Sequence, residues 1–231
     1  MKKLLSALLV SFSMIALPNS VQAVDLSVSL GAASASGGYH AVGQESIRNT
    51  GGVNYNSVSH TEEAGVFTDS HQSIFAEVNI GDNMAVGVEF AMGDIQTPTN
   101  TNAQLDKTSA AGSGSVKTNT AKASFSDKTT VYIQARMLGG LYTRVMYHNV
   151  NLISEETLNT GGAYGDATIE GLGFGLGYQH DFDDLGVFVR LEANASAYES
   201  VKAHNTNDVH KTISVSDLYG AEGSIRIGKT F

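Results

Sequence analysis

Seven histidines and a scatter of carboxylates are the residues of this chain whose types could support catalysis. One spacing stands out, because His71 and Ser73 are two residues apart and the acid Glu77 follows them in the same phase. A histidine that is oriented by a carboxylate can activate a serine hydroxyl as a nucleophile. The surroundings disfavour this chemistry, since His71 is expected where a long loop meets a strand and Ser73 is expected to face inward. We therefore assign no catalytic residue.

Metal and cofactor chemistry finds little support in the sequence. No pair of histidines has the spacing of a helical zinc motif, and His204, Asp208 and His210 fall in a segment expected to be a solvated loop. The chain contains no cysteine, which excludes thiol catalysis, disulfides, cysteine-based zinc sites and a lipidated cysteine anchor. We expect neither a metal nor a cofactor.

The composition excludes two broad classes of protein. The formal charge is −9, with 14 basic and 23 acidic residues and no basic run, so the chain lacks the cations that a nucleic-acid binder needs. Hydrophobic residues make up 42% of the chain, which is too many for a disordered protein. The mean hydropathy of −0.07 gives no sign of a membrane protein by itself.

The amino-terminal segment has the layout of a secretory signal peptide. Lys2 and Lys3 precede an apolar run at 4–17, Pro18 ends that run, and Val21-Gln22-Ala23 offers a cleavage site. The apolar run is shorter than the ~20 residues of a membrane-spanning helix. We expect cleavage of 1–23, export of a single domain over 24–231, and no later transmembrane helix.

The elements of the exported domain follow from a hydrophobic pattern with a period of two. Between Met84 and Met92, for example, every second residue is a large apolar one, and small or acidic residues stand between them. Such alternation is typical of a strand with one apolar face. It predicts eight strands, at about 24–36, 72–80, 84–95, 121–138, 141–152, 167–181, 187–199 and 214–231.

The connections between these strands alternate in length. Tight turns are expected at 81–83, 139–140 and 183–186, and long polar links at 37–71, 96–120, 153–166 and 200–213. A bacterial outer-membrane barrel has this layout, with short periplasmic turns and long outer loops. A secreted sandwich also alternates, but the predicted strands are nearer the ~9–11 residues of a tilted membrane strand than the ~5–6 of soluble sheets.

Each predicted strand has one uniformly apolar face and one face that mixes polar, small and charged residues. Near the middle of the strands, almost all charged residues fall on this mixed face, which we assign to the lumen of the barrel. All cations of this set are arginines, whose guanidinium suits buried bidentate pairing with carboxylates. The set consists of Glu77, Glu89, Arg136, Arg144, Arg190, Glu192, Glu222 and Arg226. Eight strands enclose an interior that side chains just fill, so we expect a lumen plugged by charge.

Two further placements complete the prediction for the wall. Glycines at 171, 173, 175 and 177 are expected to face inward and make room for large neighbours. The outer part of the fourth strand, with Lys122, Asp127 and Lys128, is expected to project above the bilayer.

The exported domain resembles the small eight-stranded outer-membrane barrels, a group that includes the OmpA transmembrane domain, the OmpX type and the opacity-type surface antigens. The residues that carry the resemblance are the alternating strands and a final strand with Tyr219, Ile225, Ile227 and the terminal Phe231. The resemblance implies an all-β, antiparallel, up-and-down transmembrane barrel in the outer membrane. It also implies that this carboxy-terminal pattern is a signal for the barrel assembly machinery.

We expect a non-enzymatic integral outer-membrane protein that serves envelope integrity, adhesion or as a surface antigen. Its partners would be outer-membrane lipid and lipopolysaccharide, and a host or surface ligand that binds loops 37–71 and 96–120. Two alternatives stay open: a narrow, porin-like channel for small solutes, and a lipid-modifying outer-membrane enzyme.

Overall fold

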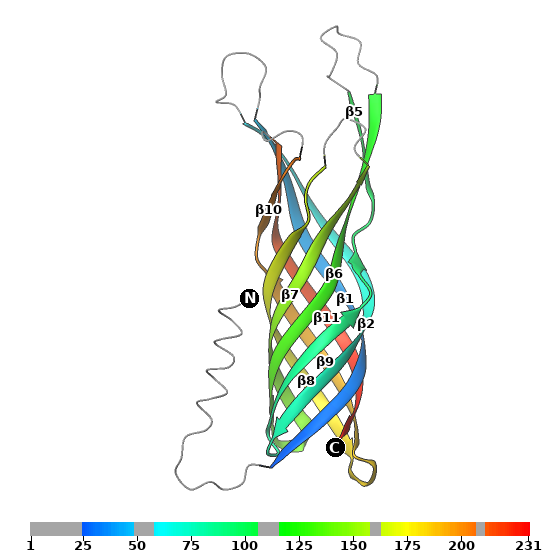
Figure 1. The fold of residues 1–231 in the computed structure, drawn as a ribbon, viewed down its shortest axis with the longest axis vertical. Coiled ribbons are helices and arrows are strands. Elements are labelled where there is room, and N and C mark those ends of the chain that lie inside the picture. Colours follow the sequence, from blue (N-terminus) through cyan, green and yellow to red (C-terminus); the bar gives the residue numbers. More distant parts are fainter. Residues whose placement is uncertain (1–24, 49–57, 106–115, 158–162, 207–210) are drawn as a thin grey trace, which may run out of the picture.

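The computed structural model describes residues 25–48, 58–105, 116–157, 163–206 and 211–231 (Figure 1). The predicted signal peptide at 1–23 lies outside these residues. The strands are β1 (Leu26–Arg48), β2 (Val58–Ile80), β3 (Met84–Met92), β4 (Ile95–Gln96), β5 (Asn100–Leu105), β6 (Val116–Arg136), β7 (Leu141–Thr157), β8 (Ala167–Phe182), β9 (Val187–Tyr198), β10 (Val201–His204) and β11 (Lys211–Thr230). Within the described ranges, no helix is long and apolar enough to cross a membrane.

The strands close into a ring of eight positions (Figure 1). Around the ring the order is β1, β2, β3, β6, β7, β8, β9 and β11, with every neighbouring pair antiparallel. The short strands β4 and β5 pair with β6 beyond the end of β3, and β10 pairs with β11 beyond the end of β9. Pairing of β1 with β11 closes the ring, and the predicted eight-stranded antiparallel barrel is confirmed.

One end of the barrel, which we call the turn end, carries the tight connections predicted from the sequence. They are the turn at 81–83 and two short 3-10 helices, η1 (Leu138–Gly140) and η2 (Asp183–Leu185). Gly81, Gly139 and Gly186 adopt positive φ values of 58°, 76° and 63°, a conformation that glycine reaches without steric cost. The described chain ends meet here as well, since the Phe231 amide donates to the Val28 carbonyl at 2.9 Å.

The opposite end, the hairpin end, differs from the prediction. Of the segments expected to be loops, 37–48 and 58–71 belong to β1 and β2, and residues 96, 100–105 and 116–120 belong to β4, β5 and β6. These extensions are rich in Ser, Thr, Asn and Gly and lack a uniformly apolar phase. The predicted boundaries were wrong because backbone pairing with a neighbouring strand stabilises these extensions without an apolar stripe.

Over the part of the wall nearest the turn end, side chains alternate as in a membrane barrel. On β7 the Arg144 side chain is fully buried inside while the next residue, Val145, is 60% exposed on the outside. Phe174 on β8 and Ile225 on β11 are likewise large, apolar and outward-facing. An apolar outer band around a polar interior is what a lipid-spanning barrel requires.

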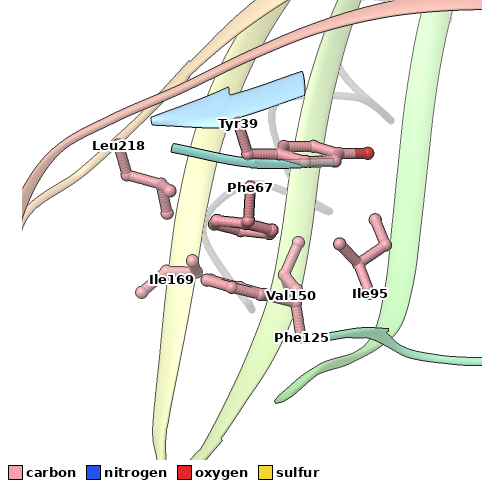
Figure 2. Packing of buried hydrophobic residues seen from close by; sticks show 7 residues of the cluster. All are labelled: Tyr39, Phe67, Ile95, Phe125, Val150, Ile169 and Leu218. Carbon is pink, nitrogen blue, oxygen red and sulfur yellow. The ribbon is translucent and has the colours of Figure 1, made fainter. Parts of the chain in front are cut away.

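Nearer the hairpin end, the side chains that point into the barrel are apolar instead of charged. Seven buried apolar side chains, which we call the apolar cap, meet inside the barrel: Tyr39, Phe67, Ile95, Phe125, Val150, Ile169 and Leu218 (Figure 2). The Phe67 ring stacks on Tyr39 and Phe125, with centroids 5.2 and 6.1 Å apart. The outward neighbours of Val150 are Asn149 and Asn151. Around Val150 the wall is therefore apolar inside and polar outside, as in a water-soluble barrel, whereas Val66 beside Phe67 is an exposed apolar residue.

Two bulges lie close to this change. Asp127 on β6 has φ 51° and the pairing of β6 with β7 shifts between Ser126 and Thr129. Asp217 on β11 has φ 49°, where the pairing of β1 with β11 shifts. An extra residue moves every later side chain to the other face of a strand. At β6 the shift turns Phe125 into the interior, on the same side as Lys128.

Candidate functional site

The lumen of the barrel is the candidate site, and its layer nearest the turn end centres on Glu77 and Arg190. The Arg190 guanidinium donates to both oxygens of the Glu77 carboxylate, at 2.9 and 2.5 Å. Its Nε donates to the side-chain amide oxygen of Gln179 at 2.6 Å, and the Tyr132 hydroxyl donates to Glu77 at 3.0 Å. The layer joins β2, β6, β8 and β9, so it ties opposite walls of the barrel together.

A second layer holds two arginines between two carboxylates. Arg226 donates to Glu89 at 2.7 Å and to Glu192 at 3.0 Å. Arg144 lies 3.1 Å from Glu192 and 3.8 Å from Glu89. Because each carboxylate faces both guanidinium groups, the four charges form one network instead of two separate pairs. We call these two layers together the polar plug.

Aromatic rings and glycines position the arginines of the polar plug. The Arg144 guanidinium lies 4.1 Å from the Tyr132 ring centroid, and that of Arg190 lies 4.2 Å from the Phe188 centroid, a contact that stabilises cations. Tyr132 lies directly against Gly87 on the neighbouring strand, where a Cβ atom would collide with the ring. Gly177 on β8 accommodates Tyr142 in the same way.

A third group of charges lies between the polar plug and the apolar cap. Lys128 donates to both oxygens of Glu222 at 3.2 Å. The Tyr39 hydroxyl of the apolar cap donates to the same carboxylate, and His71 Nδ1 lies 3.6 Å from it. Lys128 was expected to project above the bilayer; its side chain instead points into the lumen, where it is only 6% exposed, because it shares the inward phase of β6 with Thr130 and Tyr132.

Arg136 differs from the other predicted lumen residues. It lies near the turn end and is partly exposed, and it donates to the Asn79 side-chain carbonyl at 3.1 Å. Within the described residues it forms no ion pair, and its Nε makes no hydrogen bond. The other seven residues of the predicted set are buried in the polar plug or in the Lys128 group.

Little free space remains in the middle of the barrel. One cavity of about 20 Å³ lies among His71, Lys128, His148, Glu222 and Arg226. Another of about 20 Å³ lies inside the apolar cap. Each is about large enough for one water molecule. A larger cavity of about 480 Å³ opens at the turn end, below the polar plug.

The His71 and Ser73 pair is not arranged as a catalytic dyad. Both side chains are buried in the lumen, Ser73 donates to Glu89 at 2.5 Å, and Glu77 is bound to Arg190. His71 was also predicted to lie at a loop junction, which is wrong, because β2 extends beyond it on both sides. Both side chains hydrogen-bond or face groups of the lumen, away from lipid.

The metal and assembly predictions concern other parts of the chain. In the ranges that the structure describes, no group of three or more His, Asp or Glu side chains is arranged to hold a metal. His148 instead forms hydrogen bonds with Thr130 at 2.9 Å and Ser196 at 3.0 Å.

The residues of the predicted assembly signal lie on the outward face of β11 and just beyond its end, each more than half exposed: Tyr219, Ile225, Ile227 and Phe231.

A closed ring of eight antiparallel strands, an apolar outer band and a charged interior define the class of this protein. It is a small eight-stranded outer-membrane β-barrel, located in the outer membrane. The turn end is then periplasmic and the hairpin end faces outward.

Comparisons with known proteins give structural likenesses only. No family model matches the chain, and no curated protein matches it in sequence. Ail of Yersinia pestis, solved with the heparin analogue sucrose octasulfate, is 12% identical, with 87% of this chain and 99% of that chain covered and a TM-score of 0.38. OprG of Pseudomonas aeruginosa is 15% identical over 87% and 96%, with a TM-score of 0.45. The outer-membrane protease OmpT of Escherichia coli is 9% identical over 92% and 100%, with a TM-score of 0.43.

Proposed function

We propose that this chain is a non-enzymatic surface protein of the outer membrane whose lumen does not conduct solutes. The observation that carries the proposal is the double closure of the interior by the polar plug and the apolar cap. Arg144 and Arg190 are fully buried and bound to carboxylates from other strands. A solute would have to separate these charges where the dielectric constant is low and then open the apolar cap.

The surface role rests on the hairpins that continue beyond the apolar cap. The β1–β2 and β5–β6 hairpins replace the loops expected at 37–71 and 96–120, and they are the proposed contact surface for a host or surface ligand. Their exposed side chains include the carboxylates Glu62 and Glu63, which lie on opposite faces of β2. Segments already paired as strands lose less conformational entropy on binding than a long free loop does.

Export and assembly complete the proposal. Residues 1–23 would be removed as a signal peptide, and the barrel assembly machinery would recognise the carboxy-terminal strand. The outward position of Ile225, Ile227 and Phe231 supports this recognition, since their side chains are free to contact another protein before the barrel enters lipid.

Conductance in planar bilayers tests the closed lumen. We expect no discrete current steps from the folded wild-type barrel, whereas Arg144→Ala should produce them because it removes a central cation of the polar plug. Val145→Ala, one residue away on the outward face, is the matched control and should produce no current steps. Regular steps from the wild-type barrel would overturn the proposal and favour a narrow channel for small solutes.

The surface role needs a separate experiment. Removal of residues 100–121, a range that includes β5 and the part of β6 paired with it, should abolish adhesion of cells that carry the protein to host cells. The shift in gel mobility on boiling, a sign of a folded barrel, should stay. Unchanged adhesion by a folded deletion variant would contradict a contact role for this hairpin.

A further inference from the structure

The cavity at the turn end has the size and lining of a ligand site. Its volume is about 480 Å³, within the range of roughly 300–1,000 Å³ that small-molecule pockets occupy. The wall is made by the ends of β2, β6 and β8 together with the turn at 81–83 and η2. The polar plug closes it on the inner side, so it is a blind chamber that opens toward the periplasm.

Arg136 supplies an unused cation to this chamber. Its only hydrogen bond among the side chains of the described residues goes to Asn79, and its Nε is buried without an acceptor. The neighbouring Arg190 is fully engaged by Glu77 and Gln179, so no carboxylate of the polar plug serves Arg136. The planar guanidinium offers paired donors, which match a carboxylate on a ligand.

The rim of the chamber carries the opposite charge. Asp82, Asp181 and Asp183 line it together with Arg136, and the Asp181 side chain is exposed. A simple anion would be repelled by three carboxylates, and a simple cation would be repelled by Arg136. A ligand with both a carboxylate and an ammonium group satisfies both sets of charges.

We propose that this chamber binds a small zwitterion of the amino-acid or short-peptide class from the periplasm. The ligand's carboxylate pairs with Arg136, and its ammonium group faces Asp181 and Asp82. Asn79 and Gln179 provide neutral side chains beside the two charged ends. The site does not depend on conduction, because the chamber lies wholly on the periplasmic side of the polar plug.

Calorimetric titration of the folded barrel in detergent with alanylalanine tests the proposal. The probe should bind the wild-type protein, and acetate and propylamine, each with only one of its charges, should bind at least tenfold more weakly. Arg136→Gln should weaken binding of alanylalanine by roughly tenfold or more, the usual effect of losing a charged hydrogen-bonding partner. Lys229→Gln, on the outward face of β11, is the matched control and should bind as the wild type does.

Two further variants keep the test informative if Arg136→Gln does not fold. Arg136→Lys retains the charge without the paired donors and should bind with intermediate affinity. Asp181→Asn changes an exposed rim residue, so the barrel stays intact while affinity for alanylalanine falls and affinity for acetate rises. The proposal is overturned if alanylalanine does not bind, if acetate binds equally well, or if the Arg136 and Asp181 variants bind like the wild type.

Discussion

The polar plug and the apolar cap share strands β2, β6, β7, β8 and β11 yet have opposite chemistry. Below the bulges, β7 turns the fully buried Arg144 inward and Val145 outward; above them it turns Val150 inward, 2% exposed, with asparagines on the outside. A barrel wall therefore does not decide by itself which side is apolar. The surrounding medium does: lipid requires an apolar exterior, and water requires an apolar core. We expect the wall to leave the membrane near the level at which the two exchange.

The largest expected effect tests the polar plug. Arg190→Met leaves Glu77 buried without its ion-pair partner, which is expected to cost about 3–5 kcal/mol of the free energy of unfolding. The double variant Glu77→Leu with Arg190→Met should lose much less, because no unpaired charge remains. Urea unfolding in detergent micelles measures both. Equal losses in the single and double variants would show that the pair does not stabilise the plug as a unit.

A second substitution tests the apolar cap as a hydrophobic core. Phe67→Ala removes the ring that packs between Tyr39 and Phe125 and should cost about 3 kcal/mol. Phe174→Ala removes a ring of the same size from the outward face of β8, where lipid or detergent can fill the space, and should cost less. If Phe174→Ala proved the more destabilising variant in the same unfolding assay, the cap would not act as a core.

A lysine placed on the outer wall at two heights tests which part of the wall lies in the membrane. Val145→Lys puts an ammonium group into the apolar band and should cost about 2–4 kcal/mol if it lies near the bilayer midplane. Thr68→Lys, beside the inward Phe67 of the apolar cap, should cost about 0–1 kcal/mol because it meets water or headgroups. Unfolding from lipid vesicles measures this difference. Equal costs would place both positions in the same medium.

The smallest expected effect concerns the bulge at Asp127. Asp127→Val should be less stable than Asp127→Gly by about 1–2 kcal/mol, because a branched side chain is disfavoured at a φ of 51°. Both variants lose the hydrogen bond that Asn151 donates to Asp127, so the difference isolates the backbone. Urea unfolding of the two variants side by side gives the value. Equal stability would mean that β6 pairs without the bulge.

The sequence predicts the barrel well, because alternation and turn chemistry are local properties. The turns with Gly81, Gly139 and Gly186 and the eight ring positions are where the pattern puts them. The inward phase also follows from local alternation. Which charges pair does not: Glu77 and Arg190 lie 113 residues apart, and strand tilt and ring closure bring them together.

The region above the bilayer is where sequence reasoning falls short. Val150 and Ile169 share the inward phase with Arg144 and the inward glycines, so alternation alone does not reveal a change of medium. Phe125 illustrates the second difficulty, since it is out of phase with the inward Arg136 and a single extra residue near Asp127 turns it into the interior. One available signal is that Val150 and Ile169 continue the inward phase while polar residues occupy the outward phase beside them.

The pairing of β1 with β11 also has a consequence for how the chain folds. These strands come from opposite ends of the exported sequence, and Ser29 faces Thr230 in their register. Contacts at such sequence separation form late, because loop closure must be achieved before they stabilise anything. A partly translocated chain therefore exposes the unpaired edge of β1 until its last twenty residues arrive. Aggregation during export should then depend on how that edge is protected, more than on the stability of the finished barrel.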